Sequence, residues 1–257
     1  MSSYYWAFWY AVVFLSRLPA PTLQRIDDDV AQKSLLFYPL VGVLLGTLLL
    51  LFVACCWWYQ PQPSATLLAA MSVTLWTLLT GALHLDGLAD SADAWVGGLG
   101  DREKTLAIMK DPQAGPMGVV AVVLLLLLQF SALQLLFEQT LGDGDIWPLL
   151  SLLLIPALAR ASVLGILAST PYVRAKGLAT ALVQGARYPR ITVIGIILAL
   201  TAGLILQQKA LLVLLSYLAL NVWMRRLMMQ RLGGCTGDTL GAAIALQEVL
   251  LLCVYVF

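Results

Sequence analysis

The sequence predicts an all-α fold, a polytopic integral membrane bundle of about seven transmembrane helices with a short N-terminal helix before them. Hydrophobic residues make up 61% of the 257 residues and charged residues only 11%, whereas a typical soluble domain carries about 25% charged residues. The mean hydropathy is +0.88. The apolar stretches are continuous and do not alternate as transmembrane β-strands do, and several reach the roughly 20 residues that a spanning helix needs.

The first element is expected before Arg17, in the aromatic-rich segment MSSYYWAFWYAVVFLS. This segment is too short to cross a bilayer, so we expect an interfacial or re-entrant helix with its Trp and Tyr side chains at headgroup level. Spanning helices are then expected at 35–58, 64–85, 116–137, 146–168, 190–207, 209–224 and 240–257. Only QQK separates the fifth from the sixth. Because no repeat or linker divides the chain, we predict a single membrane-embedded catalytic domain over residues 1–257.

Basic residues are distributed unevenly among the connecting segments. Thirteen of the 15 Lys and Arg residues lie before the first span, in 86–115, in 169–189 with the start of the next span, and in 225–239. The alternating segments hold only Lys209, and Arg160 lies inside a span. The positive-inside rule places the basic segments in the cytoplasm. We therefore expect a multi-pass protein of the bacterial inner membrane with a periplasmic C-terminus.

Charge and cysteine content exclude other classes. The net charge of +1 argues against a nucleic-acid partner. The four cysteines have no spacing typical of a zinc site or of a disulfide framework. The expected partners are therefore the lipid bilayer and a small-molecule substrate, and a homo-oligomer is compatible with the sequence.

The segment HLDGLADSADAW (84–95) carries three aspartates and the only histidine of the chain, directly after an apolar run. In a helix, the spacing of four and then three residues places Asp86, Asp90 and Asp93 on one face. Clustered carboxylates with water are ligands that suit Mg²⁺ bound to a phosphate. A solvated acidic face is the alternative. His84 is interpreted as a proton acceptor or as a hydrogen-bond donor to a phosphate. Alternatively, it is a histidine of the protein core.

The segment IMKDPQAGPMG (108–118) places Lys110 and Asp111 before a Gly- and Pro-rich turn that includes Gly115. Backbone N–H groups at the start of the following helix can hold an anion. An ordinary interfacial turn explains the same residues.

The segment RLGGCTGDTLGAAIALQE (231–248) is a glycine-rich loop that leads into the last span. Here we expect Arg231, Thr236 and Gly237 to contact substrate and Asp238 to act as a metal ligand or base. Alternatively, Asp238 is only a helix N-cap.

In PYVRAKGLA (171–179), Arg174 is interpreted as a phosphate ligand or as a positive-inside anchor. Two ionisable residues lie deeper, Arg160 in the fourth span and Glu248 in the last. Because intramembrane charges are costly, we expect these two to pair or to have a function.

The four polar segments all lie on the predicted cytoplasmic side, although their chemistry played no part in assigning the topology. Carboxylates for Mg²⁺ together with Lys and Arg for phosphate oxygens are typical of phosphoryl transfer.

With these motifs, the chain resembles the cobalamin synthase family, the adenosylcobinamide-GDP ribazoletransferases. The resemblance extends over nearly the whole chain. The matching segments are FLSRLPAP (14–21), FYPLVGVLLG (37–46), HLDGLADSADAW (84–95), IMKDPQAGPMG (108–118), PYVRAKGLA (171–179) and GGCTGDTLGAA (233–243). Three positions depart from the family pattern: Ala94, Pro112 and Ala245 stand where Gly, Ser and an acid are common. No carboxylate of the central cluster is lost.

The resemblance implies a Mg²⁺-dependent enzyme that joins adenosylcobinamide-GDP to α-ribazole, or to its 5′-phosphate, with release of GMP. It would act in the last step of nucleotide-loop assembly in vitamin B12 synthesis. The metal would be held by Asp86, Asp90, Asp93 and Asp238. His84 would help to deprotonate the attacking hydroxyl. Phosphate and substrate would be bound by Arg17, Arg102, Lys110, Asp111, Gly115, Arg174, Arg231, Thr236 and Gly237.

Two other functions are compatible with parts of the sequence. A CDP-alcohol phosphotransferase also uses an Asp-rich helix and Mg²⁺ at a membrane face, but the later D-x3-D of that family is missing here. A secondary transporter would use Glu248 and Arg160 as an intramembrane site, but the chain shows no inverted repeat.

Overall fold

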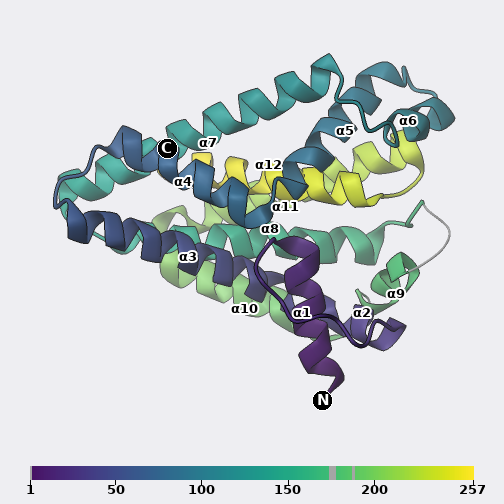
Figure 1. Ribbon diagram of the computed structural model, residues 1–257, viewed down its shortest axis with the longest axis horizontal. Coiled ribbons are helices and arrows are strands. Elements are labelled where there is room, and N and C mark those ends of the chain that lie inside the picture. Colours follow the sequence, from purple (N-terminus) through teal and green to yellow (C-terminus); the bar gives the residue numbers. More distant parts are fainter. Residues whose placement is uncertain (1, 174–177, 187–188) are drawn as a thin grey trace.

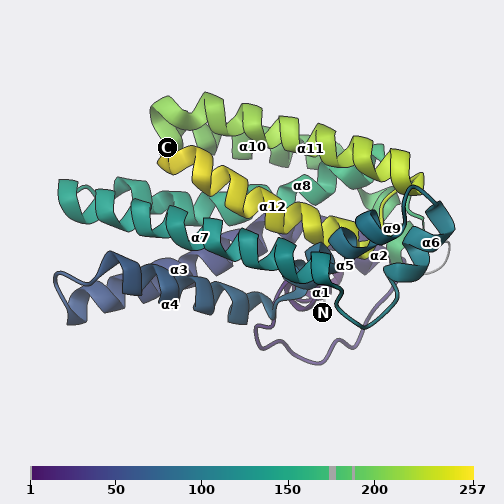
Figure 2. The ribbon, with the colours of Figure 1, turned by 90° about the horizontal axis from the view of Figure 1, so that it is seen from above.

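The computed structural model describes residues 2–173, 178–186 and 189–257 and confirms the all-α prediction for that part of the chain. The long helices lie side by side with their axes roughly parallel (Figure 1). Figure 2 shows the same helices stacked in layers when the bundle is seen from above. The described residues form no β-strand, only an isolated bridge between Tyr172 and Cys235.

The N-terminal helix α1 (Ser3–Leu15) has 13 residues and lies across the first spanning helix (Figure 1). Its length fits the predicted interfacial or re-entrant helix. The short helix α2 (Asp28–Ser34) begins where the Asp27 side chain accepts a hydrogen bond from the Val30 N–H at 2.9 Å. A 3₁₀ turn, η1 (Leu35–Phe37), then leads into α3 (Tyr38–Tyr59).

A sharp bend separates α4 (Ala65–Thr80) from α5 (Leu83–Gly97), whose axes differ by 87°. Gly81 and Ala82 have φ angles of +60° and +57°, a left-handed conformation that ends a helix. The prediction of one helix over 64–85 followed by a loop is therefore wrong. The acidic segment is a second helix that turns away from the first.

The next helices are α6 (Arg102–Ile108), α7 (Pro116–Asp143) and α8 (Ser151–Ser169), the last preceded by a 3₁₀ turn, η2 (Trp147–Leu150). Helix α8 is buried along most of its length. Glycines of α3 permit its close approach, because a Cβ at Gly42 would lie 2.4 Å from the Pro156 carbonyl oxygen. Helix α8 therefore forms the centre of the bundle.

The predicted loop 169–189 contains a helix, α9 (Leu178–Gly185). Helices α10 (Pro189–Leu206) and α11 (Ala210–Leu232) follow, joined by the 3₁₀ turn η3 (Gln207–Lys209). The chain ends with α12 (Gly237–Val256). The predicted loop 225–239 is also partly helical, because α11 continues to Leu232.

Helices α10 and α11 are two separate spans. By length and apolar composition, the described chain has five candidate spans, or six if α4 and α5 form one. That count takes residues 189–232 as a single run, which would be about 66 Å long and twice the roughly 30 Å hydrocarbon core. The run reverses instead. Arg190 contacts Tyr4, Lys209 reaches the Tyr255 carbonyl near the C-terminus, and the Leu232 carbonyl returns to Arg102.

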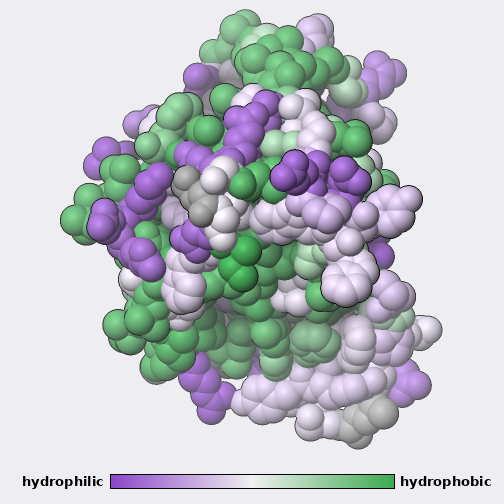
Figure 3. All heavy atoms as spheres, turned by 90° about the vertical axis from the view of Figure 1, so that its left-hand side faces the viewer, coloured by the Kyte–Doolittle hydropathy of each residue, from purple (hydrophilic) through white to green (hydrophobic). Residues whose placement is uncertain are grey.

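The two ends of the bundle differ. Helices α5 and α6 and the start of α12 gather at one end, and the C-terminus lies toward the other (Figure 1). Figure 3 looks onto the left-hand end of Figure 1, where hydrophilic side chains lie among hydrophobic ones. The predicted catalytic segments therefore share the end of the bundle that Figure 3 does not face.

Candidate active site

The site is built on a close crossing of α5 and α12, a contact that needs glycine at position 87 of α5. A Cβ at Gly87 would lie 2.6 Å from the Asp238 carbonyl oxygen. A Cβ at Gly241 would lie 3.6 Å from the Cα of His84. The crossing places the start of α12, with Asp238, against the first turns of α5, with His84 and Asp86.

A cavity of about 230 Å³ lies at this crossing. His84, Asp86, Asp238 and Tyr38 contribute its ionisable side chains, and much of the remaining wall is apolar. His84 is buried, Asp86 is exposed and Asp238 is half-buried. The structure thus brings Asp238 together with His84 and Asp86, which precede it by about 150 residues in the sequence. It joins two carboxylates with the only imidazole of the chain.

Asp93 has a different environment on the same helix. One of its carboxylate oxygens accepts the Gly115 N–H at 2.7 Å, and the other accepts the Gly118 N–H at 2.9 Å. The predicted anion at the start of α7 is therefore the carboxylate of Asp93 in this structure. The interaction fastens α5 to α7, because a carboxylate at a helix N-terminus is stabilised by the unpaired N–H groups there. Asp90 lies between Asp86 and Asp93 and is half-buried.

The donor set fits Mg²⁺. Within the described ranges, no three His, Cys, Asp or Glu side chains are gathered closely enough to hold a metal ion by themselves. Mg²⁺, however, is usually held by one or two carboxylates, with waters and substrate phosphates completing the octahedron. The carboxylates of Asp86 and Asp238, which reach one cavity from two helices, match that requirement.

The loop before α12 is held by its backbone. Cys235 donates its N–H to the Pro171 carbonyl at 2.8 Å, and its carbonyl accepts the Val173 N–H at 2.9 Å. Thr236 is the N-cap of α12 and forms a capping box with Thr239. Asp238 is the second residue of the helix, so the interpretation of Asp238 as the N-cap is wrong. Gly237 is the first.

Burial of Cys235 raises the pKa of its thiol to about 11.

The predicted phosphate ligands surround this end of the bundle. Arg102 donates from Nε to the Leu232 carbonyl at 2.7 Å, and Arg231 approaches Gly100 from the other side of the same junction. Lys110 is exposed on the turn after α6. Arg17 is exposed and packs over the bend, since a Cβ at Gly81 would lie 2.2 Å from the Arg17 Cγ.

The charges of these basic residues are not neutralised by acidic side chains of the described chain. Among the residues that the structure describes, none of Arg17, Arg102, Lys110 and Arg231 forms an ion pair. Asp111 accepts the Gln113 N–H within the exposed turn at 3.0 Å. Arg174 lies outside the described residues.

The predicted intramembrane pair is confirmed. Arg160 is fully buried and donates from Nη1 to Glu248 Oε1 and, at 3.0 Å, to the Pro156 carbonyl. Trp76 donates from Nε1 to the same glutamate oxygen at 3.2 Å. Such a pair keeps both charges compensated inside the bundle.

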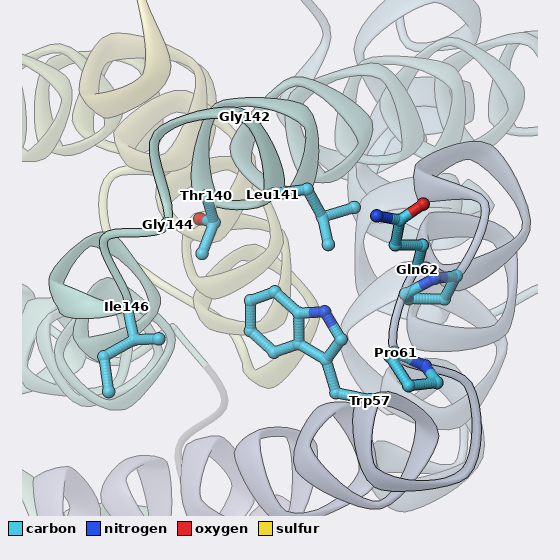
Figure 4. A pocket seen from close by; sticks show the side chains of 9 residues that line it. Trp57, Pro61, Gln62, Thr140, Leu141, Gly142, Gly144 and Ile146 are labelled. Atoms are coloured by element: carbon cyan, nitrogen blue, oxygen red, sulfur yellow. The ribbon is translucent and has the colours of Figure 1, made fainter.

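A larger cavity of about 550 Å³ opens at the opposite end of the bundle (Figure 4). Trp57 points into it from the end of α3, while Leu141 approaches from the last turn of α7 and Ile146 from the connection that follows (Figure 4). The described residues that line it have no ionisable side chain. The candidate chemistry therefore belongs to the cavity at the α5–α12 crossing.

The fold is that of a multi-pass membrane protein, and the carboxylates, imidazole and basic groups at one end are of the kinds that a phosphoryl transferase uses. The family model described as "Cobalamin-5-phosphate synthase" matches residues 7–256. The chain belongs to this family, which confirms the predicted resemblance over the two alternatives.

Several curated relatives are similar over nearly their full length. Proteins described as "Adenosylcobinamide-GDP ribazoletransferase" from Pseudomonas entomophila (strain L48) and Pseudomonas putida (strain W619) are 47% and 49% identical to this chain. The alignments cover 95% and 94% of this chain and 96% and 95% of the relatives. No solved structure matches the chain significantly.

Sequence reasoning missed part of the site. Phe14 of α1 and Tyr38 of α3 line the cavity at the α5–α12 crossing. Both lie in segments that match the family, but neither was interpreted as a site residue. The hydrogen bond from Trp76 to Glu248 joins residues 172 positions apart, so the sequence does not reveal it. The glycines at the crossing could have been found from the sequence, because Gly87 and Gly241 lie within the two motifs that carry the aspartates.

Proposed function

We propose that this enzyme transfers the cobinamide phosphate of adenosylcobinamide-GDP to a hydroxyl of α-ribazole or its 5′-phosphate. The attacking oxygen forms a bond to the phosphorus next to the cobinamide, and the bond from that phosphorus to the bridging oxygen breaks. The hydroxyl proton is lost and GMP leaves. The observation that carries the proposal is the shared cavity of Asp86, Asp238 and His84. The names of the relatives support the substrate.

Asp86 and Asp238 are proposed to hold Mg²⁺, with Asp90 as a further ligand on the same face of α5. When bound, the ion would neutralise the charge that develops on the diphosphate oxygens. The protein contributes rigidity, because the glycine contact fixes the two helices that present the carboxylates. Asp93, the fourth predicted ligand, is proposed to act instead as the anchor of α5 on α7.

The unpaired basic residues are proposed to bind the outer phosphate oxygens. Arg102 and Arg231 lie at the junction of α6 with α11, beside the loop that leads to Asp238. Their guanidinium groups can each make two hydrogen bonds to a phosphate. Lys110 supplies a further positive charge from the turn before α7, while Arg17 is placed at the α4–α5 bend. Binding at several points positions the diphosphate for in-line attack.

His84 is proposed to accept the proton of the attacking hydroxyl. It is the only imidazole of the chain, and it lines the cavity that holds the two carboxylates. An imidazole whose lone pair faces the hydroxyl can act as a general base. The aromatic rings of Phe14 and Tyr38 line the same cavity, where they can pack against the substrate.

The chain is a multi-pass membrane protein, and we propose that it lies in the bacterial inner membrane with the catalytic end in the cytoplasm. The distribution of Lys and Arg supports this orientation. It places the C-terminus in the periplasm.

The test is GMP release by the purified enzyme in detergent, with adenosylcobinamide-GDP and α-ribazole as substrates. We expect release that depends on Mg²⁺ and stops when EDTA is added. The variant Asp86→Asn should lose at least about 100-fold in kcat, as expected when a group that acts on the transition state is removed. Asp101→Asn, at an exposed helix start, is the matched control. Full turnover by Asp86→Asn, or turnover in EDTA, would contradict the proposal.

A further inference from the structure

His84 lies between two cavities, of which the catalytic cavity is only one. Within the described chain, it is the one residue that lines both that cavity and a second cavity of about 20 Å³. The polar side chains of the second cavity come from Trp76, Thr77, Thr80, His84, Gln129 and Glu248. The smaller cavity thus connects the catalytic imidazole to the intramembrane acid.

Glu248 is anchored through one oxygen only. Its Oε1 accepts hydrogen bonds from Arg160 and from Trp76. Within the described ranges, Oε2 accepts no hydrogen bond. The anchored carboxylate therefore has an acceptor left for the cavity that it shares with His84.

His84 has the complementary group. Its Nδ1 is buried and has no hydrogen-bond partner in the protein. A buried polar nitrogen without a partner costs roughly 1–3 kcal/mol. Space of about 20 Å³ is enough for one water, which needs at least about 10–15 Å³ and two to four polar partners. The volume, the donor and the acceptor therefore all match a single water.

We propose that one buried water in this cavity bridges His84 Nδ1 and Glu248 Oε2, so that Glu248 positions the imidazole with Nε2 toward the catalytic cavity. Nδ1–H donates to the water, and the water donates to the carboxylate. Arg160 and Trp76 act through Glu248 and hold it in place. This inference rests on the proposed function in one respect only, namely that Nε2 accepts the proton of the substrate hydroxyl.

The bridge has a consequence that can be measured without turnover. In the proposed bridge the water accepts from Nδ1–H and donates to Glu248, which places the proton of the neutral imidazole on Nδ1 and leaves the lone pair on Nε2. Because the chain has one histidine, ¹⁵N-histidine labelling gives the signals of His84 alone. The protein must carry an affinity tag without histidine.

The first measurement is the ¹⁵N spectrum of the full-length protein in detergent or nanodiscs. We expect the Nδ1-protonated tautomer. A predominantly Nε2-protonated imidazole in the unaltered protein would overturn the bridge, whatever the outcome of the GMP-release assay.

The second measurement uses the double variant Arg160→Met/Glu248→Leu. Removing both charges avoids the unpaired buried charge that either single change would leave, and it is often neutral for stability. The variant should shift His84 to a mixed or Nε2-protonated state. Its kcat should fall roughly 10- to 100-fold, as for a misplaced catalytic group, with KM within about twofold.

Gln247→Met is the matched control. Gln247 is the neighbour of Glu248 on α12, but its side chain donates to the Tyr217 carbonyl of α11 at 3.0 Å. We expect the control to keep the spectrum of His84 and the kcat of the unaltered protein. A double variant that also kept both would show that Glu248 has no positioning role. A control that lost both the spectrum of His84 and the kcat would also count against a positioning role of Glu248. Any buried change in α12 would then be enough to disturb His84.

Discussion

Replacing Asp93 with alanine should weaken the attachment of α5 to α7 and destabilise the protein. The carboxylate accepts two backbone N–H groups, from Gly115 at 2.7 Å and from Gly118 at 2.9 Å. A hydrogen bond to a charged group contributes about 1.5–3 kcal/mol, so the two together contribute roughly 3–6 kcal/mol. Asp93 is half-buried and water can reach the freed amides. We therefore expect a loss of about 2–4 kcal/mol in the free energy of unfolding.

The measurement is an SDS unfolding titration followed by tryptophan fluorescence. Asp93→Asn keeps one acceptor oxygen and should lose about half as much as the alanine variant. Asp101→Asn is the control, because Asp101 accepts the Lys104 N–H at the exposed start of α6 and asparagine caps a helix equally well. The control should stay within about 0.5 kcal/mol of the unaltered protein.

The anchor also has to be distinguished from a metal ligand. If Asp93 only fastens the helices, Asp93→Asn should keep the Mg²⁺ concentration for half-maximal GMP release within about threefold, and Asp86→Asn should not. The reasoning is refuted if Asp93→Ala unfolds like the unaltered protein while its Mg²⁺ requirement rises tenfold or more.

Three further changes test the site and its supports. Gly87→Val should cost about 1–3 kcal/mol in unfolding free energy and most of kcat, because its side chain would meet the α12 backbone; a normal kcat would argue against the crossing. Arg160→Leu alone should destabilise the protein by about 3–5 kcal/mol, since it leaves a buried carboxylate unpaired; an SDS titration checks this. The raised pKa of the Cys235 thiol, about 11, means that it is protonated at neutral pH. Its maleimide labelling should therefore be slow at pH 7, should accelerate as pH rises toward 11 and should become fast on unfolding, whereas equally fast labelling of Cys235 and exposed Cys55 at pH 7 would contradict its burial.

Much of the bundle was predictable because its signal is local. Apolar runs of spanning length give the order of the long helices. The sequence leaves the boundary at QQK uncertain, and the structure has a 3₁₀ turn there between α10 and α11. The pairing of Arg160 with Glu248 was also predictable, since two isolated intramembrane charges of opposite sign need each other.

The bend between α4 and α5 is not predicted because alanine rarely adopts the left-handed φ that Ala82 has here. Alanine is the best helix former, and the apolar run continues through the break. Similarly, Gly115 had the composition of an anion site, but the sequence does not reveal that the anion is Asp93. The contact between Asp93 and Gly115 joins residues 22 positions apart, so no local pattern marks it.

The bend explains how an acidic helix can follow directly on a membrane span. Residues 65–97 as one straight helix would be roughly 50 Å long, well beyond the roughly 30 Å hydrocarbon core. Asp86, Asp90 and Asp93 would then stand in water, away from Asp238. The 87° turn instead directs α5 back across the end of the bundle. The glycine contact with α12 then holds the carboxylates against the buried histidine, where a phosphate can be bound from both helices.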